Sequence, residues 1–196
     1  CTKIFQRFFL SRKHLSPLEN LQMVRHEFLR GKRYRSRKTT VEYERAPQEE
    51  LRAPNAILYN PSCWDESNGP EIRELNQFRA ELIVALRKAF GPRFIGGFRR
   101  IGSAFHLYPQ AVEDRVLNHD EYVEALRRSN LTVYTNGTLG CFSWRFAEVL
   151  AASKCIVSEP IPNEVGFPLD ESVGVLQRPT IEAMVETLLQ LDRDPQ

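Results

Sequence analysis

From residue 54 onward, short apolar runs alternate with longer segments of helical periodicity, and this alternation constrains the fold more than any other feature. The apolar run at 55–62 (NAILYNPS) predicts a buried strand. The apolar spacing that follows predicts a helix that Pro70 opens and Gly91 closes. The same patterns predict strands at 93–98, 131–135, 155–160 and 173–177, and helices at 118–129, 143–154 and 180–191.

Strands that alternate with helices of 10 to 20 residues are typical of right-handed crossovers and a parallel sheet. We therefore expect an α/β, Rossmann-like fold with helices on both faces of the sheet. Ligands of such folds bind at the carboxyl ends of the strands. The loops to consider are those that directly follow strands, at 60–69, 96–106, 135–143 and 158–167.

Composition narrows the classes of protein. Hydrophobic residues make up 42% and charged residues 27% of the 196 residues, which suits a packed core. The net charge of +2 gives no global field for nucleic acid or a membrane surface. No run reaches the roughly 18 apolar residues of a membrane helix. The four cysteines lack metal-ligand spacing, so we expect a reduced, cytoplasmic location and no bound metal.

The first 44 residues differ from the rest, and the segment 30–38 (RGKRYRSRK) carries six basic residues in nine. The segment is either a solvated connector, which we favour, or a patch for phosphate or nucleic acid. Its one aromatic, Tyr34, does not support a stacking platform, so we expect no nucleic-acid partner. Because the chain begins at Cys1, we expect it to be a fragment of a longer protein.

The stretch 140–160 places Arg145 in the first turn of a predicted helix, with Glu148 one turn later. A cation there opposes the helix dipole, at a cost of a few tenths of a kcal/mol, unless an anion docks beside it. One interpretation is a local ion pair between Arg145 and Glu148. In the other, Arg145 and the helix amides hold a diphosphate, while Glu148 accepts hydrogen bonds from a ribose.

The segment 129–159 (SNLTVYTNGTLGCFSWRFAEVLAASKCIVSE) resembles the donor-binding motif of GT-B glycosyltransferases. In that motif a strand, a loop and a helix ending in a glutamate precede small or apolar residues and another strand. Ser143-x-Arg145-x-x-Glu148 is similar to the Ser-x-Arg-x-x-Glu segment of exostosin-type enzymes. One departure concerns the Glu-x7-Glu pattern of many retaining members, whose first glutamate would fall at Gly140.

The resemblance implies the C-terminal half of a GT-B architecture. Residues 45–196 would form the nucleotide-sugar-binding domain, and residues 1–44 the tail of an acceptor domain with its linker. The donor would be a UDP- or GDP-linked sugar, transferred without metal or cofactor to a hydroxyl acceptor that stays unidentified. A peripheral membrane location stays open, and no catalytic residue is assigned. The alternative is a non-catalytic nucleotide-binding module of the same fold.

Within that resemblance, Glu148 would contact the ribose, and the phosphates or sugar would lie near the start of the helix. The residues implied in donor binding are Asn136, Gly137, Thr138, Phe142, Ser143, Arg145, Glu148, Arg99 and Arg100.

Trp64 and Asp65 follow the first strand, where a donor or acceptor loop belongs. Trp64 is equally well explained as a lid over the core.

Overall fold

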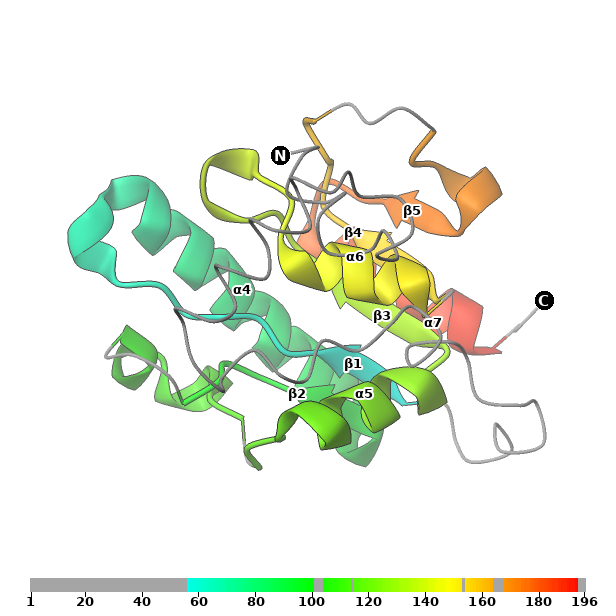
Figure 1. Ribbon diagram of the computed structural model, residues 1–196, viewed down its shortest axis with the longest axis horizontal. Coiled ribbons are helices and arrows are strands. Elements are labelled where there is room, and N and C mark those ends of the chain that lie inside the picture. The colour runs from blue at the N-terminus through cyan, green and yellow to red at the C-terminus, as the bar shows by residue number, and fades with distance from the viewer. Residues whose placement is uncertain (1–55, 101–103, 114, 153, 164–167, 194–196) are drawn as a thin grey trace, which may run out of the picture.

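Figure 1 shows a computed structural model of the chain, which describes residues 56–100, 104–113, 115–152, 154–163 and 168–193. Its strands and helices, labelled as in Figure 1, are β1 (Ile57–Tyr59), α4 (Pro70–Phe90), β2 (Phe94–Gly96), α5 (His119–Arg128), β3 (Leu131–Tyr134), α6 (Trp144–Ala151), β4 (Cys155–Ser158), β5 (Val175–Gln177) and α7 (Ile181–Arg193). Every strand and helix predicted from residue 54 onward is present. The segment 1–44 and its boundary at 45 lie outside the described residues.

The five strands form one parallel sheet in the order β2-β1-β3-β4-β5. An isolated parallel bridge joins Phe98, just after β2, to Val112 on the outer edge. If this bridge is counted as a rudimentary strand, the order becomes 3-2-1-4-5-6, that of doubly wound dinucleotide-binding folds. The predicted Rossmann-like α/β fold is thus confirmed.

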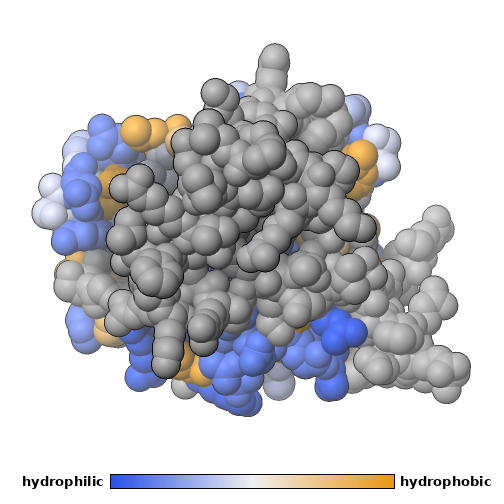
Figure 2. All heavy atoms as spheres, viewed as in Figure 1, coloured by the Kyte–Doolittle hydropathy of each residue, from blue (hydrophilic) through white to orange (hydrophobic). Residues whose placement is uncertain are grey.

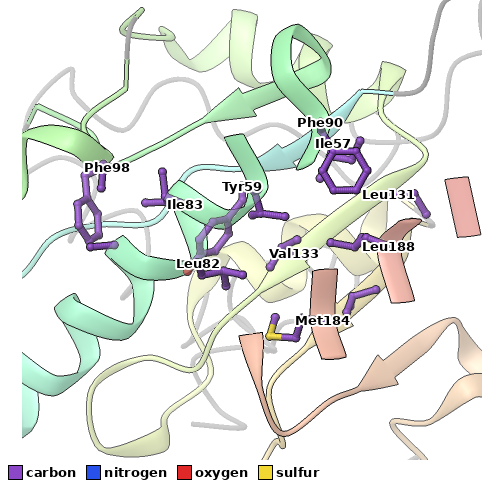
Figure 3. Packing of buried hydrophobic residues seen from close by; sticks show 14 of the residues in the cluster. Ile57, Tyr59, Leu82, Ile83, Phe90, Phe98, Leu131, Val133, Met184 and Leu188 are labelled. Carbon is purple, nitrogen blue, oxygen red and sulfur yellow. The ribbon is translucent and has the colours of Figure 1, made fainter. Parts of the chain in front are cut away.

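Helices cover both faces of the sheet, and the side chains of successive strand residues alternate between them. Ile57 and Tyr59 pack with α4 and α7, as Figure 3 shows, whereas Leu58 packs with α5 and α6. Fully burying an aliphatic or aromatic side chain contributes about 1.5–3 kcal/mol. The two apolar clusters therefore fix which helix lies on which face.

Helix ends follow the predicted signals. Pro70 is the first residue of α4, and Gly91 ends it with φ 53°. Asn118 and Glu121 form a reciprocal capping box at the start of α5. The Thr180 hydroxyl oxygen accepts a hydrogen bond from the Ala183 amide at the start of α7. These local signals confirm the predicted ends of α4 and the predicted starts of α5 and α7, whereas α6 ends at Ala151, before the predicted end at 154.

Where described residues are visible in Figure 2, they are mostly hydrophilic, with small separate hydrophobic areas. No helix in the described ranges is long and apolar enough to cross a membrane.

Gly96, at the end of β2, lies so close to β1 that a side chain does not fit. Its φ is 139°, and a Cβ there would lie 1.9 Å from the Tyr59 carbonyl oxygen. The next amide, of Gly97, donates to the same oxygen at 3.0 Å. The close approach brings the loop after β2 against the loop after β1.

We expect Gly96→Ala to lower the free energy of unfolding by at least about 2 kcal/mol, because it combines backbone strain with a clash against backbone. Gly91→Ala is the matched control, since Gly91 also has positive φ but has no atom within 4 Å of the added Cβ. We expect it to cost about 1 kcal/mol. Urea unfolding measures both, and equal losses would contradict the close approach at Gly96.

Candidate functional site

A crevice opens at the carboxyl ends of β1 and β3, which are neighbours in the sheet. After β1 the chain continues into α4 on one face, and after β3 it continues into α6 on the other. The two connections therefore diverge from adjacent strands. This is the topological switch point, where open α/β sheets bind their ligands.

A cavity of about 80 Å³ occupies this crevice. Its walls come from segments far apart in the sequence: β1 and β3 with the loops that follow them, the first two turns of α6, and single side chains of α4 and α5. The polar lining includes Ser62, Arg79, Tyr122, Thr135, Ser143 and Arg145. Whole-ligand pockets span roughly 300–1,000 Å³, so this cavity suits one compact group such as a phosphate.

Arg79 of α4 joins the two sides of the crevice. Its side chain is buried, and its guanidinium donates to the Ser62 carbonyl at 2.8 Å and the Asn136 carbonyl at 2.6 Å. Its Nε donates to Thr135 Oγ1 at 3.1 Å, and the Tyr59 hydroxyl shares that oxygen at 2.9 Å. All these partners are neutral, so among the described residues Arg79 forms no ion pair.

Arg145 reaches the cavity from the first turn of α6. Its Nη1 donates to Glu148 Oε2 at 2.8 Å, and its guanidinium carbon lies 3.7 Å from the centre of the Tyr122 ring. The two charged side chains are 28% and 17% exposed, so the pair is only partly solvated. The ion-pair interpretation thus describes the contact, but Arg145 also lines the cavity, whereas Glu148 does not.

Arg99 lies on the β2 side of the crevice. Its Nη2 donates to the Ser62 hydroxyl at 2.5 Å, and its buried Nε has no hydrogen-bond partner in the described parts of the chain. Burial lowers the pKa of Arg99, and the positive charge of Arg145 lowers it further. The carboxylates of Glu113 and Glu148 oppose this effect, but burial remains the largest cause, so the charge of Arg99 is incompletely compensated.

The loop after β3 folds back on itself. The Gly137 amide donates to the Cys141 carbonyl at 2.6 Å, and a Cβ at Gly137 would lie 2.8 Å from that oxygen. Glycine is therefore required at this turn for steric reasons. The turn brings Ser143, the residue before α6, to the cavity, where the Tyr134 hydroxyl accepts its amide hydrogen at 3.1 Å.

The structure brings together some of the residues proposed from sequence. Gly137, Ser143 and Arg145 line the cavity, and Arg99 adjoins it through Ser62. The other five proposed residues are not part of the cavity lining: Asn136, Thr138, Phe142, Glu148 and Arg100.

Three of these five make contacts within the fold. The Asn136 side chain donates to the Pro160 carbonyl at 2.9 Å, so it joins the ends of β3 and β4. The Phe142 ring stacks on Phe146, 5.1 Å between centroids, and belongs to the core. The Arg100 guanidinium donates to the Glu113 carbonyl oxygen, away from the lining.

Sequence reasoning missed Arg79, Tyr122 and Ser62. Arg79 had a usable signal, because it lies four residues after position 75 and three before position 82, both part of the apolar spacing of α4. A charged residue on the buried face of a helix needs hydrogen-bond partners there. Tyr122 and Ser62 carry no such signal, since a tyrosine in an amphipathic helix and a serine in a loop are common.

The carboxyl group of Glu159 lies beside the loop that follows β3. Glu159 accepts the Asn136 amide hydrogen at 2.6 Å, and burial raises its pKa while the charge of Arg79 opposes that rise. In the portion of the chain that is described, no group of three or more His, Cys, Asp or Glu side chains could hold a metal ion.

No model of a known protein family matches this chain, and a search of curated proteins finds no match either.

We expect Arg79→Leu to lower the free energy of unfolding by at least about 2 kcal/mol, because it leaves the carbonyls of Ser62 and Asn136 without their donor. Arg73→Leu on the same helix is the control, since Arg73 is 66% exposed and pairs with Glu66 at the surface. We expect that change to stay under about 1 kcal/mol. If urea unfolding gives equal losses, Arg79 does not hold the crevice together.

Proposed function

We propose that this chain binds the diphosphate of a nucleotide-sugar in the crevice between β1 and β3, as the donor-binding half of a glycosyltransferase. The sugar would pass from the diphosphate oxygen to the oxygen of an acceptor hydroxyl, which loses its proton, and the nucleoside diphosphate would leave. The proposal rests on the switch-point cavity together with the donor-motif resemblance of 129–159. A UDP- or GDP-linked sugar is the proposed donor.

The observation that carries the proposal is the convergence of three guanidinium groups on one crevice. Arg79 and Arg145 line the cavity, and Arg99 adjoins it through Ser62. Of these three arginines, only Arg145 forms an ion pair with a carboxylate of a described residue. Guanidinium groups bind phosphate oxygens bidentately, and a cavity of about 80 Å³ accepts one phosphate group.

The positive charges of these arginines also suit the step in which the sugar is transferred. Negative charge grows on the leaving diphosphate as the bond to the sugar breaks, and fixed positive groups stabilise that charge. Arg79 is held by three hydrogen bonds and cannot readily turn away. In this proposal the arginines supply the stabilisation that a divalent cation gives at other phosphate sites, so no metal is required.

A second candidate is a non-catalytic nucleotide-binding module. Two observations favour it: Glu148 pairs with Arg145 and does not line the cavity, and Gly140 stands where many retaining glycosyltransferases carry an acidic residue. The two candidates share the anion site. They differ in whether Glu148 holds a ribose and whether a sugar is transferred.

We expect Arg145→Gln and Arg99→Gln each to weaken pyrophosphate binding by about 10-fold or more, because each removes a charge-assisted hydrogen bond. Isothermal titration calorimetry of the full 196-residue chain with pyrophosphate, UDP and GDP measures this. Arg128→Gln is the control, since Arg128 is 61% exposed and pairs with Glu124 on α5. The absence of pyrophosphate and nucleotide binding at millimolar concentration would refute both candidates.

Glu148→Gln separates the two candidates. If Glu148 holds the ribose, the change weakens UDP and GDP binding several-fold, while pyrophosphate binding is kept or improved because a competing carboxylate is gone. In the non-catalytic module, pyrophosphate and nucleotides change by the same factor. Hydrolysis or transfer of the sugar from a UDP- or GDP-sugar, lost in Arg145→Gln, would support the enzyme.

A further inference from the structure

Trp64 places a large aromatic side chain at the mouth of the crevice. It lies in the loop between β1 and α4, is 46% exposed and lines the cavity. The alternative, that Trp64 is a lid over the core, does not agree with this exposure. An exposed aromatic beside a largely apolar cavity that carries a few polar groups is typical of a binding surface.

The backbone of Trp64 is held by a buried amide. The Trp64 N–H donates to Asn76 Oδ1 at 3.0 Å, and Asn76 Nδ2 donates to the Trp64 carbonyl at 2.7 Å. Asn76 is fully buried in α4, and its side-chain amide forms its hydrogen bonds with residues of the loop between β1 and α4. The clamp fixes the position of Trp64 through its backbone, and within the described ranges the indole forms no hydrogen bond or ring contact.

The residues that follow Trp64 are fixed as well. Asp65 accepts the Ser67 amide hydrogen at 3.0 Å. Glu66 accepts hydrogen bonds from Tyr108 Oη at 2.6 Å and from Asn76 Nδ2 at 3.3 Å. A loop tied at several points loses little conformational entropy when a ligand binds, and this favours affinity.

The volume of the cavity limits which part of a nucleotide can lie inside it and which part can contact the indole. A volume of about 80 Å³ accepts a phosphate group but not a nucleoside, so the rest of a nucleotide must lie at the mouth. Trp64 is part of the lining at that point, two residues from Ser62, whose hydroxyl binds Arg99. Flat π faces stack well on each other, and bases stack on aromatic side chains with little dependence on base identity.

We propose that the indole of Trp64 is the stacking surface for the nucleobase of a nucleotide whose phosphates occupy the cavity between β1 and β3. This inference rests on the proposed function. It assigns the base to the β1 side of the crevice. Trp64 then contributes to the affinity for nucleotides but not to the affinity for pyrophosphate. Because stacking is tolerant of base identity, UDP and GDP both gain from it.

The test compares Trp64→Leu, which keeps apolar volume without a π face, with Trp64→Phe, which keeps a π face. Calorimetry of the 196-residue chain with UDP, GDP, UDP-glucose and pyrophosphate gives the affinities. We expect Trp64→Leu to weaken nucleotide binding by about 5-fold or more, the effect of losing one base–aromatic stack. Trp64→Phe retains most of the affinity, and pyrophosphate binding stays within about 2-fold in both variants. Thermal unfolding checks that both variants fold.

Leu107→Ala is the control for an exposed hydrophobic residue outside the cavity lining, at 61% exposure, and leaves all affinities unchanged.

Unchanged nucleotide binding in Trp64→Leu, with pyrophosphate still bound, overturns the inference and leaves the proposed function intact. Equal losses for pyrophosphate and nucleotides also overturn it, because Trp64 would then act on the anion site. A loss confined to UDP-glucose, with UDP unaffected, assigns the stacked ring to the sugar and overturns the base assignment. No pyrophosphate binding in the unmodified chain removes the proposed function itself.

Discussion

The buried guanidinium of Arg79 is the interaction on which the geometry of the crevice depends. Parallel strands end without a turn to join them, and among the described residues no backbone hydrogen bond links the loop after β1 to the loop after β3. Arg79 supplies that connection by donating to the Ser62 and Asn136 carbonyls. A charge held this deeply requires a full set of hydrogen bonds, and this requirement keeps both loops in place.

The positive charge of Arg99 is incompletely compensated in the crevice. Burial lowers its pKa, and the charge of Arg145 lowers it further. The carboxylates of Glu113 and Glu148 oppose this effect but do not outweigh the burial of Arg99. Local features that reduce stability are expected where a sequence must bind a ligand, because the ligand supplies the missing interaction.

The sequence predicted the layers of the fold well and the site less well. Periodicity and caps are local, so the capping box of Asn118 and the helix opened by Pro70 are readable from neighbouring residues. The crevice is assembled from residues as distant as Ser62 and Arg145, and no local pattern encodes such a meeting. The loop residues Asn136 and Phe142 were proposed from motif position, but their side chains serve the β3–β4 junction and the core. The buried position of Arg79 could have been predicted, because this charged residue interrupts the apolar face of the predicted helix.

The two sides of the crevice differ in how freely they can respond to a ligand. On the β1 side, Arg79 is tied to both loops, and the Asn76 amide clamps the backbone of Trp64. On the α6 side, Arg145 is bound to Glu148 on its own helix and lies over the Tyr122 ring of α5, so neither loop has to move when it exchanges the carboxylate for another anion. Glu148 would then be released toward the hydroxyl groups of the same ligand. The ion pair is therefore compatible with a binding site, because it keeps Arg145 ordered beside the cavity until a stronger anion takes the place of the carboxylate.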